Sequence, residues 1–162
     1  MATIYLGLGS NVDPEANLRA AVDELRERFR SVVLSPVYQS AAVGFEGDDF
    51  LNLVARVESD LGPREVIVEI EAIHDLAGRR RSSDPFGPRV IDVDLLLYED
   101  LVVDEPGLKL PRKDVLEYGF VLKPLSDIAP DLLHPVTRRT ISDHWQEAAP
   151  AAARLDRVEL SI

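Results

Sequence analysis

Hydrophobic and polar residues follow two different periods along this chain. In some runs the apolar residues are consecutive or alternate with polar ones, which is typical of strands; in others they recur every three or four positions, as on one face of a helix. The strand-like runs lie at 3–8, 31–38, 51–59 and 87–98. The helical runs lie at 14–30 and 63–77. The pattern therefore predicts the order β-α-β-β-α-β.

This order is typical of an α+β, ferredoxin-like sandwich, in which one mainly antiparallel sheet carries helices on one face. The rest of the chain adds shorter elements. We expect an antiparallel partner strand at 101–103, an extended piece at 108–111, a helix between 119 and 130, a last helix at 140–145 and an edge strand at 154–162. A chain of 162 residues is predicted to form a single domain, 1–162.

Local signals set the expected ends of several elements. Asp13 followed by Pro14 is typical of a helix start, with Asp as the N-cap and Pro at the first helical position. Gly78 is expected to end the second helix. Gly7 and Gly9 are expected to open a turn after the first strand.

The run GPRVIDVDLLLY at 87–98 is the most informative part of the chain. On a strand, Asp92 and Asp94 point to the same face about 6 to 7 Å apart. Two carboxylates at this spacing repel by roughly 3 kcal/mol at an effective dielectric constant near 20. A cation between them would relieve that repulsion, and Mg²⁺ prefers such oxygen ligands. The residues expected to point into the core instead are Ile91, Val93 and Leu95. The alternative is a solvated sheet face.

Arginines lie just upstream of this strand, at positions 79, 80, 81 and 89. Carboxylates for a metal beside arginines for phosphate suggest a metal-bound polyphosphate. Alone, the arginine run would be a solvated basic loop. Beside the aspartates we favour phosphate binding, with Arg80 facing solvent.

Composition excludes several classes of protein. The chain has no cysteine, which excludes disulfides, thiolate metal sites and cysteine nucleophiles. The formal net charge of −11 disfavours general nucleic-acid binding. No apolar run approaches the roughly 20 residues of a membrane span, and the N-terminus has no signal-peptide pattern. We therefore expect a cytoplasmic protein without nucleic-acid or membrane partners.

Several motifs together resemble one family, the 6-hydroxymethyl-7,8-dihydropterin pyrophosphokinases of folate biosynthesis. The resemblance runs from about residue 4 to residue 135. The motifs that carry it are YLGLGSN (5–11), SPVYQSAAVG (35–44), FLN (50–52), GRRR (78–81), FGPRVIDVDLLLY (86–98) and GFVLKPLSDIAP (119–130).

Members of that family transfer the β,γ-pyrophosphate of ATP to the hydroxymethyl group of a reduced pterin, and AMP leaves. The resemblance thus implies an Mg-dependent pyrophosphokinase with a ferredoxin-like fold, ATP as co-substrate, two Mg²⁺ ions and a monomeric state. The small-molecule partners that it implies are ATP and the pterin.

The resemblance also assigns roles to residues. The implied metal ligands are Asp92 and Asp94, and the implied phosphate-facing arginines are Arg79, Arg81 and Arg89. Further positions near the nucleotide are Glu71, His74, Phe86, Arg112 and Lys113. The positions near the pterin are Ser40, Ala41, Val43, Phe50, Asn52, Phe86 and Phe120. Among these, Asn52 matches the asparagine that binds the pterin edge, and Phe120 is the preferred stacking partner.

The departures from the family pattern concentrate around the nucleotide. Glu71 and His74 replace a glutamine and a glutamate, and Phe86 replaces a tryptophan. Arg112 and Tyr118 replace a histidine and an arginine that contact ATP in the family. Two alternatives to a working pyrophosphokinase stay open: a diverged paralogue that binds pterin but uses ATP poorly or not at all, and a metal-dependent phosphohydrolase or nuclease built on the aspartate pair.

Overall fold

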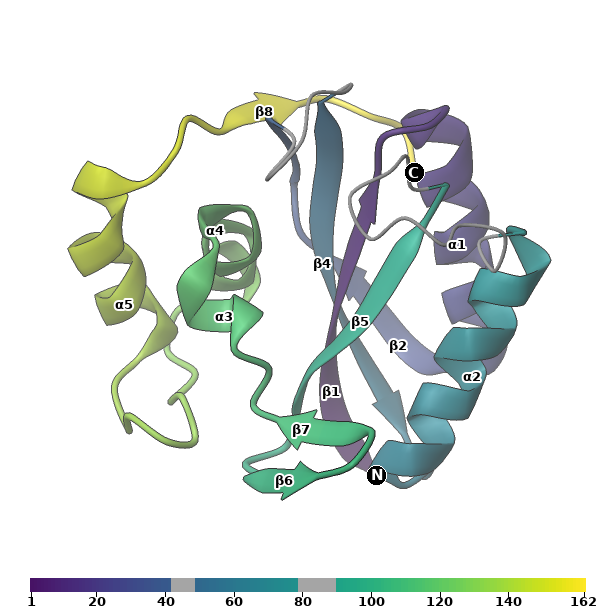
Figure 1. The fold of residues 1–162 in the computed structure, drawn as a ribbon, viewed down its shortest axis with the longest axis horizontal. Coiled ribbons are helices and arrows are strands. Elements are labelled where there is room, and N and C mark those ends of the chain that lie inside the picture. The colour runs from purple at the N-terminus through teal and green to yellow at the C-terminus, as the bar shows by residue number, and fades with distance from the viewer. Residues whose placement is uncertain (42–48, 79–89) are drawn as a thin grey trace.

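The computed structural model describes residues 1–41, 49–78 and 90–162, and their centre is an antiparallel sheet (Figure 1). The strand order is β5-β1-β4-β3-β8, and β2 also pairs with β4. The strands of this sheet are β1 (Ala2–Ser10), β2 (Arg30–Leu34), β3 (Val37–Ser40), β4 (Phe50–Ser59), β5 (Asp92–Tyr98) and β8 (Asp156–Val158). A separate two-stranded sheet consists of β6 (Val103–Glu105) and β7 (Leu108–Leu110).

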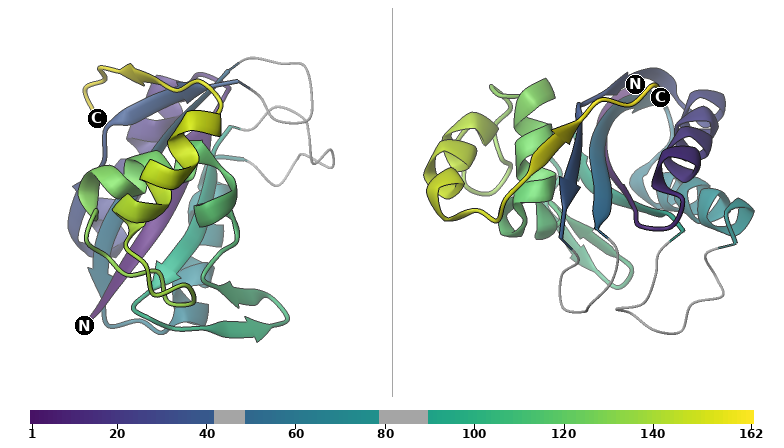
Figure 2. Two further views of the ribbon diagram at one scale, coloured as in Figure 1. Left: turned by 90° about the vertical axis from the view of Figure 1, so that its left-hand side faces the viewer. Right: turned by 90° about the horizontal axis from the view of Figure 1, so that it is seen from above.

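Helices cover both faces of the central sheet (Figures 1 and 2). One face carries α1 (Pro14–Arg28) and α2 (Pro63–Leu76). The other face carries α3 (Asp114–Glu117), α4 (Gly119–Ile128) and α5 (Ile141–Ala148), followed by a 3₁₀ turn (Ala149–Ala151). The predicted ferredoxin-like arrangement is confirmed for the β-α-β-β-α-β part, and the C-terminal helices add a third layer.

The two layers of helices create two hydrophobic cores, because successive strand residues point to opposite faces. Ile4, Leu6 and Leu8 of β1 pack with the apolar stripes of α1 and α2. Tyr5 of the same strand packs with α3, α4 and α5 on the other side. The period-two pattern of the strands therefore supplies side chains to both cores. On the second face, the part of β1 that follows Tyr5 contributes no side chain to the core cluster.

One predicted strand, 31–38, is in fact two strands. Proline has no N–H group to donate to a sheet, and Pro36 separates β2 from β3. Ser35 bridges the break: its N–H donates to the carbonyl oxygen of Val54 at 2.9 Å, and its Oγ accepts from the N–H of Val54 at 2.9 Å. Both strands therefore remain paired with β4.

Several predicted boundaries are corrected. The strand expected at 101–103 does not pair with β5, because β6 pairs with β7 instead. Gly7 and Gly9 lie inside β1 rather than in a turn, since β1 continues to Ser10. The edge strand expected at 154–162 is present but shorter, as β8, which pairs with β3. The short helix α3 was not predicted.

The expected helix ends are partly confirmed. Asp13 directly precedes α1, but it has a positive φ of 44° and its side chain makes no capping hydrogen bond. Thr140 caps α5, because its side-chain oxygen accepts from the N–H of Asp143 at 3.0 Å. Gly78, with φ of 76°, follows the end of α2. Among the described residues, no helix is long and apolar enough to cross a membrane.

Candidate active site

The two aspartates expected to bind metal lie on β5, at the margin of the central sheet. Asp92 pairs with Gly9 of β1, and Asp94 pairs with Gly7. Both carboxylates are half-buried, whereas Val93 between them is 1% exposed on the opposite face. The aspartates therefore share one face of the strand, as predicted.

The glycines of β1 leave open space beside these carboxylates. Residues directly opposite each other in a sheet point to the same face, so a side chain at position 7 or 9 would stand next to an aspartate. A Cβ atom added to Gly7 would lie 3.4 Å from the side chain of Leu96. A Cβ atom added to Gly9 would lie 2.7 Å from Oδ1 of Asn52. Because both positions are glycine, the backbone of β1 forms the floor of a shallow depression between β5 and β4. We call this depression the cradle.

Asn52 of β4 lies on the far side of this cradle. It pairs with Gly9, which in turn pairs with Asp92, so all three residues form one row across the sheet. Two strand spacings separate the amide from the carboxylate row, or about 10 Å. The Asn52 side chain is buried, and its Nδ2 donates to Oγ of Ser40 at 2.9 Å. The amide is therefore held in place at one end of the row.

One aromatic ring lies beside this row, and two others pack against the core on the same face of the sheet. Phe50 begins β4, and its Cδ1 lies 3.8 Å from the Cβ position of Gly9. Phe120, near the start of α4, stacks on Tyr118 with ring centroids 4.9 Å apart and planes 14° apart. Both Tyr118 and Phe120 pack against the core cluster of the second face. These rings supply flat apolar surfaces suited to a heterocycle.

Charges cluster around Asp94. Nη2 of Arg112 lies 3.6 Å from Oδ1 of Asp94, and Nε of Arg112 lies 3.2 Å from Oδ2 of Asp114. Burial raises the pKa of Asp94; Arg112 partly offsets this effect, while Asp92 and Asp114 add to it. Asp94 is thus a carboxylate whose ionised form gains from an additional cation.

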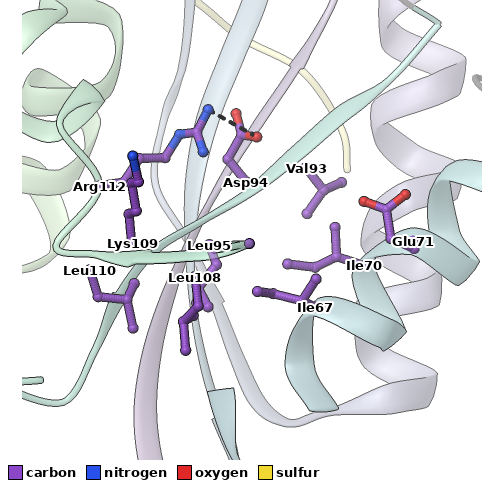
Figure 3. A pocket seen from close by; sticks show the side chains of 11 residues that line it. Ile67, Ile70, Glu71, Val93, Asp94, Leu95, Leu108, Lys109, Leu110 and Arg112 are labelled. Atoms are coloured by element: carbon purple, nitrogen blue, oxygen red, sulfur yellow. Dashed lines mark ion pairs between the residues drawn. The ribbon is translucent and has the colours of Figure 1, made fainter. Parts of the chain in front are cut away.

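A pocket opens directly beside Asp94, between α2, β5 and the β6–β7 hairpin (Figure 3). Its polar groups come from Glu71, Asp94, Lys109 and Arg112, and the remaining walls are mainly apolar. The other lining residues are Ile67, Ile70, Val93, Leu95, Gly107, Leu108 and Leu110. A pocket that combines apolar residues with several charged side chains suits a small molecule that has both apolar and charged parts.

The residues predicted for the nucleotide do not all reach this pocket. Glu71 and Arg112 line it. His74 is 5% exposed and is not among the lining residues; its Nε2 accepts a hydrogen bond from the N–H of Val93 at 2.9 Å. Lys113 is exposed just before α3 and also lies outside the lining.

Of the residues predicted for the pterin, Ser40, Phe50 and Asn52 lie together, and Ala41 is exposed just after β3. Five predicted site residues lie outside the described residues: Val43, Arg79, Arg81, Phe86 and Arg89. Sequence reasoning missed the role of Gly7 and Gly9 as the floor of the cradle. The alternation of β1, with its even-numbered residues apolar, was the signal that could have placed them in the strand.

The model of the 7,8-dihydro-6-hydroxymethylpterin-pyrophosphokinase (HPPK) family matches residues 5–130. The chain belongs to the HPPK family. A 2-amino-4-hydroxy-6-hydroxymethyldihydropteridine pyrophosphokinase of Aquifex aeolicus is 38% identical over 149 residues, covering 91% of this chain and 92% of that relative. A protein of the same name from Methylorubrum extorquens is 38% identical over 166 residues, covering 98% of this chain and 100% of that relative. The predicted family is confirmed.

Solved structures support the HPPK fold. The HPPK-DHPS of Plasmodium falciparum, wild type with STZ-DHP, superimposes with a TM-score of 0.77 at 14% sequence identity. The match covers 98% of this chain but 47% of that longer chain, so the chain spans about half of this structural neighbour. At this identity the likeness concerns the fold, and the ferredoxin-like prediction is confirmed.

Proposed function

We propose that this protein transfers the β,γ-pyrophosphate of ATP to the hydroxymethyl group of 6-hydroxymethyl-7,8-dihydropterin, a step of folate biosynthesis. The observation that carries the proposal is the row Asp92–Gly9–Asn52 across three neighbouring strands. The row brings a carboxylate and an amide onto one face with a glycine between them, and this supports a polyphosphate at one end and a heterocycle at the other. Membership in the HPPK family favours this transfer over the phosphohydrolase alternative.

The pterin is proposed to lie over Gly9. At one end, Asn52 offers amide groups to the polar edge of the ring, and Ser40 holds that amide in position. Phe50 and Phe120 flank the ring, so its flat faces meet apolar surface. This orientation directs the hydroxymethyl group toward the aspartates of β5.

The nucleotide is proposed to occupy the pocket beside Asp94. Apolar walls from α2 and the β6–β7 hairpin suit the base, and Arg112 lies where the pocket meets the carboxylates. The phosphates would then extend from the pocket toward Asp94, where Arg112 supplies positive charge. Arg79, Arg81 and Arg89 remain predicted phosphate contacts on the basis of the sequence.

The donor set suits Mg²⁺ that arrives with ATP. Within residues 1–41, 49–78 and 90–162, no group of three or more His, Cys, Asp or Glu side chains is arranged to hold a metal ion. Mg²⁺ is commonly held by one or two carboxylates, with substrate phosphates and water completing its coordination. Asp92 and Asp94 would hold the ions, which when bound neutralise charge on the transferring group. We propose two Mg²⁺ ions on the basis of the family resemblance.

In the proposed reaction the hydroxymethyl oxygen attacks the β-phosphorus of ATP. A new bond forms between that oxygen and the β-phosphorus, the bond from the β-phosphorus to the α,β-bridging oxygen breaks, AMP leaves, and the hydroxyl proton is released. The residues of this chain contribute mainly by position: Asn52 and the aromatic rings fix the acceptor, and Arg112 and the aspartates fix the donor. Positioning and charge stabilisation supply most of the catalysis in such transfers.

The test is to incubate the protein with Mg-ATP and 6-hydroxymethyl-7,8-dihydropterin and to measure the AMP that forms by chromatography. We expect AMP to appear only when both substrates are present, and an Asp94→Ala variant to form none above background. If folded wild-type protein binds pterin but forms no AMP, the diverged paralogue is the better description. Release of phosphate from ATP without pterin would instead support the phosphohydrolase.

The monomeric state, the cytoplasmic location and the lack of nucleic-acid and membrane partners stay predictions from the sequence. They do not enter the proposed reaction, because the residues that carry it all come from one copy of the chain.

A further inference from the structure

His74 contacts the backbone of the strand that carries the aspartate pair. Val93 lies between Asp92 and Asp94, and its N–H donates to Nε2 of His74 at 2.9 Å. The strand β5 has β1 as its neighbour in the central sheet and ends the strand order on its other side. The imidazole, which comes from the last turn of α2 and is 5% exposed, thus supplies the acceptor that a further strand would otherwise give.

The hydrogen bond determines where the neutral imidazole carries its proton. A ring nitrogen that accepts a hydrogen bond is unprotonated, so the proton lies on Nδ1. Nδ1 is 3.4 Å from Oε1 of Glu71, three residues earlier on α2. Within the part of the chain that the structure describes, Nδ1 makes no hydrogen bond, so the hydrogen bond that the imidazole does make is the one to the Val93 amide of β5, and Glu71 lies beside the other side of the ring.

A second side chain holds the start of the same segment. Oγ of Ser10, at the end of β1, donates to the carbonyl oxygen of Val90 at 2.6 Å. Ser10 is completely buried. The Val90–Ile91 peptide and the Asp92–Val93 peptide are thus each held by a side chain from another element, one from β1 and one from α2.

We propose that His74 is a positioning residue, which fixes the peptide between Asp92 and Asp94 so that both carboxylates keep the direction needed to bind Mg-ATP. This inference rests on the proposed function. It assigns to His74 a role different from the nucleotide contact expected from the sequence, because the ring lies against the strand and does not line the pocket. Groups that orient metal ligands typically affect metal affinity or activity by about 10- to 100-fold.

Two substitutions of His74 distinguish loss of the hydrogen-bond acceptor from loss of the imidazole ring. In His74→Gln the amide group reaches the place of Nε2 and can still accept from Val93. In His74→Asn the shorter amide corresponds to Nδ1 and leaves the Val93 N–H without that acceptor. We expect His74→Asn to lower kcat and to weaken Mn²⁺ binding, in the presence of α,β-methylene-ATP, by about 10- to 100-fold. We expect His74→Gln to recover most of both, and pterin affinity to stay unchanged in both variants.

Mn²⁺ binding is measured by electron paramagnetic resonance and is independent of turnover. Wild-type protein that binds Mn²⁺ with the analogue but forms no AMP would refute the proposed function and leave the positioning role standing. Equal Mn²⁺ affinity in wild type and His74→Asn would overturn the positioning role. Weaker binding of the metal-free analogue in both variants would instead identify a nucleotide contact and also overturn it.

A measurement on the wild-type protein covers the case in which His74→Asn does not fold. Nuclear magnetic resonance should detect a scalar coupling across the hydrogen bond between the Val93 amide nitrogen and Nε2 of His74, with the ring proton on Nδ1. A ring protonated on Nε2, or a missing coupling in well-resolved spectra, would overturn the inference.

Discussion

Replacing Gly9 by alanine tests the floor of the cradle. The added Cβ would lie 2.7 Å from Oδ1 of Asn52, much closer than carbon and oxygen atoms normally approach without bonding. The backbone of β1 is held between β4 and β5, so the Asn52 amide has to move. Gly9→Ala is therefore expected to damage the pterin side of the site while leaving the aspartates unchanged in sequence.

The size of the effect follows from what Asn52 loses. Its Nδ2 donates to Ser40 at 2.9 Å in a buried position, and such a hydrogen bond contributes about 0.5 to 1.5 kcal/mol. A buried polar group left without a partner costs about 1 to 3 kcal/mol. Because 1.4 kcal/mol is a factor of ten in affinity, we expect pterin to bind about 10-fold more weakly or worse.

Titration calorimetry with pterin alone measures this directly. Ser40→Ala removes only the hydrogen-bond partner of Asn52, so it is expected to have a smaller effect than Gly9→Ala. Gly7→Ala, on the same strand and face, is expected to leave pterin affinity near that of the wild type, because its Cβ would meet Leu96 at 3.4 Å. Folded Gly9→Ala protein that binds pterin as tightly as the wild type would refute the proposed location of the ring.

Two further predictions concern stability and activity. Burial raises the pKa of Asp94, so the folded state binds its proton more tightly than the unfolded state, and ionisation of Asp94 costs stability as the pH rises. Asp94→Asn is therefore expected to raise the melting temperature of the metal-free protein at about pH 7, with little gain below about pH 4. The same variant is expected to form no AMP. A lower melting temperature at neutral pH would contradict the prediction on stability. Thr140→Ala removes the cap of α5 and should cost about 1 kcal/mol in urea unfolding, whereas Thr140→Ser should not; equal stability of the two variants would show that the cap contributes little.

Sequence periodicity was sufficient for the elements with long, regular patterns. The first two helices, the strands β1, β4 and β5 and the common face of Asp92 and Asp94 follow from spacing alone, because apolar residues must reach a core. The Thr140 cap was also predictable, since a hydroxyl at that position satisfies an exposed N–H of the first turn.

The rest depends on contacts between distant parts of the chain. Residues 103–105 pair with 108–110 in a hairpin. A strand of three residues is too short for its pattern of apolar and polar positions to show which strand it pairs with. Likewise, the role of His74 depends on how α2 packs beside β5, which the sequence of the helix does not specify. The row Asp92–Gly9–Asn52 required the register of two strand pairs, and register is set by the whole sheet.

The position of β5 at the margin of the sheet also affects how copies of the protein meet. An open strand edge is a template on which another chain can add, and such edges promote aggregation unless they are blocked. Here the N–H of Val93 is taken by His74, and the carbonyl oxygen of Leu96 accepts from the N–H of Arg112 at 2.9 Å. Groups from α2 and from the segment after β7 therefore occupy two hydrogen-bonding positions on the open edge of β5, and they leave fewer positions on which a second chain could add as a strand.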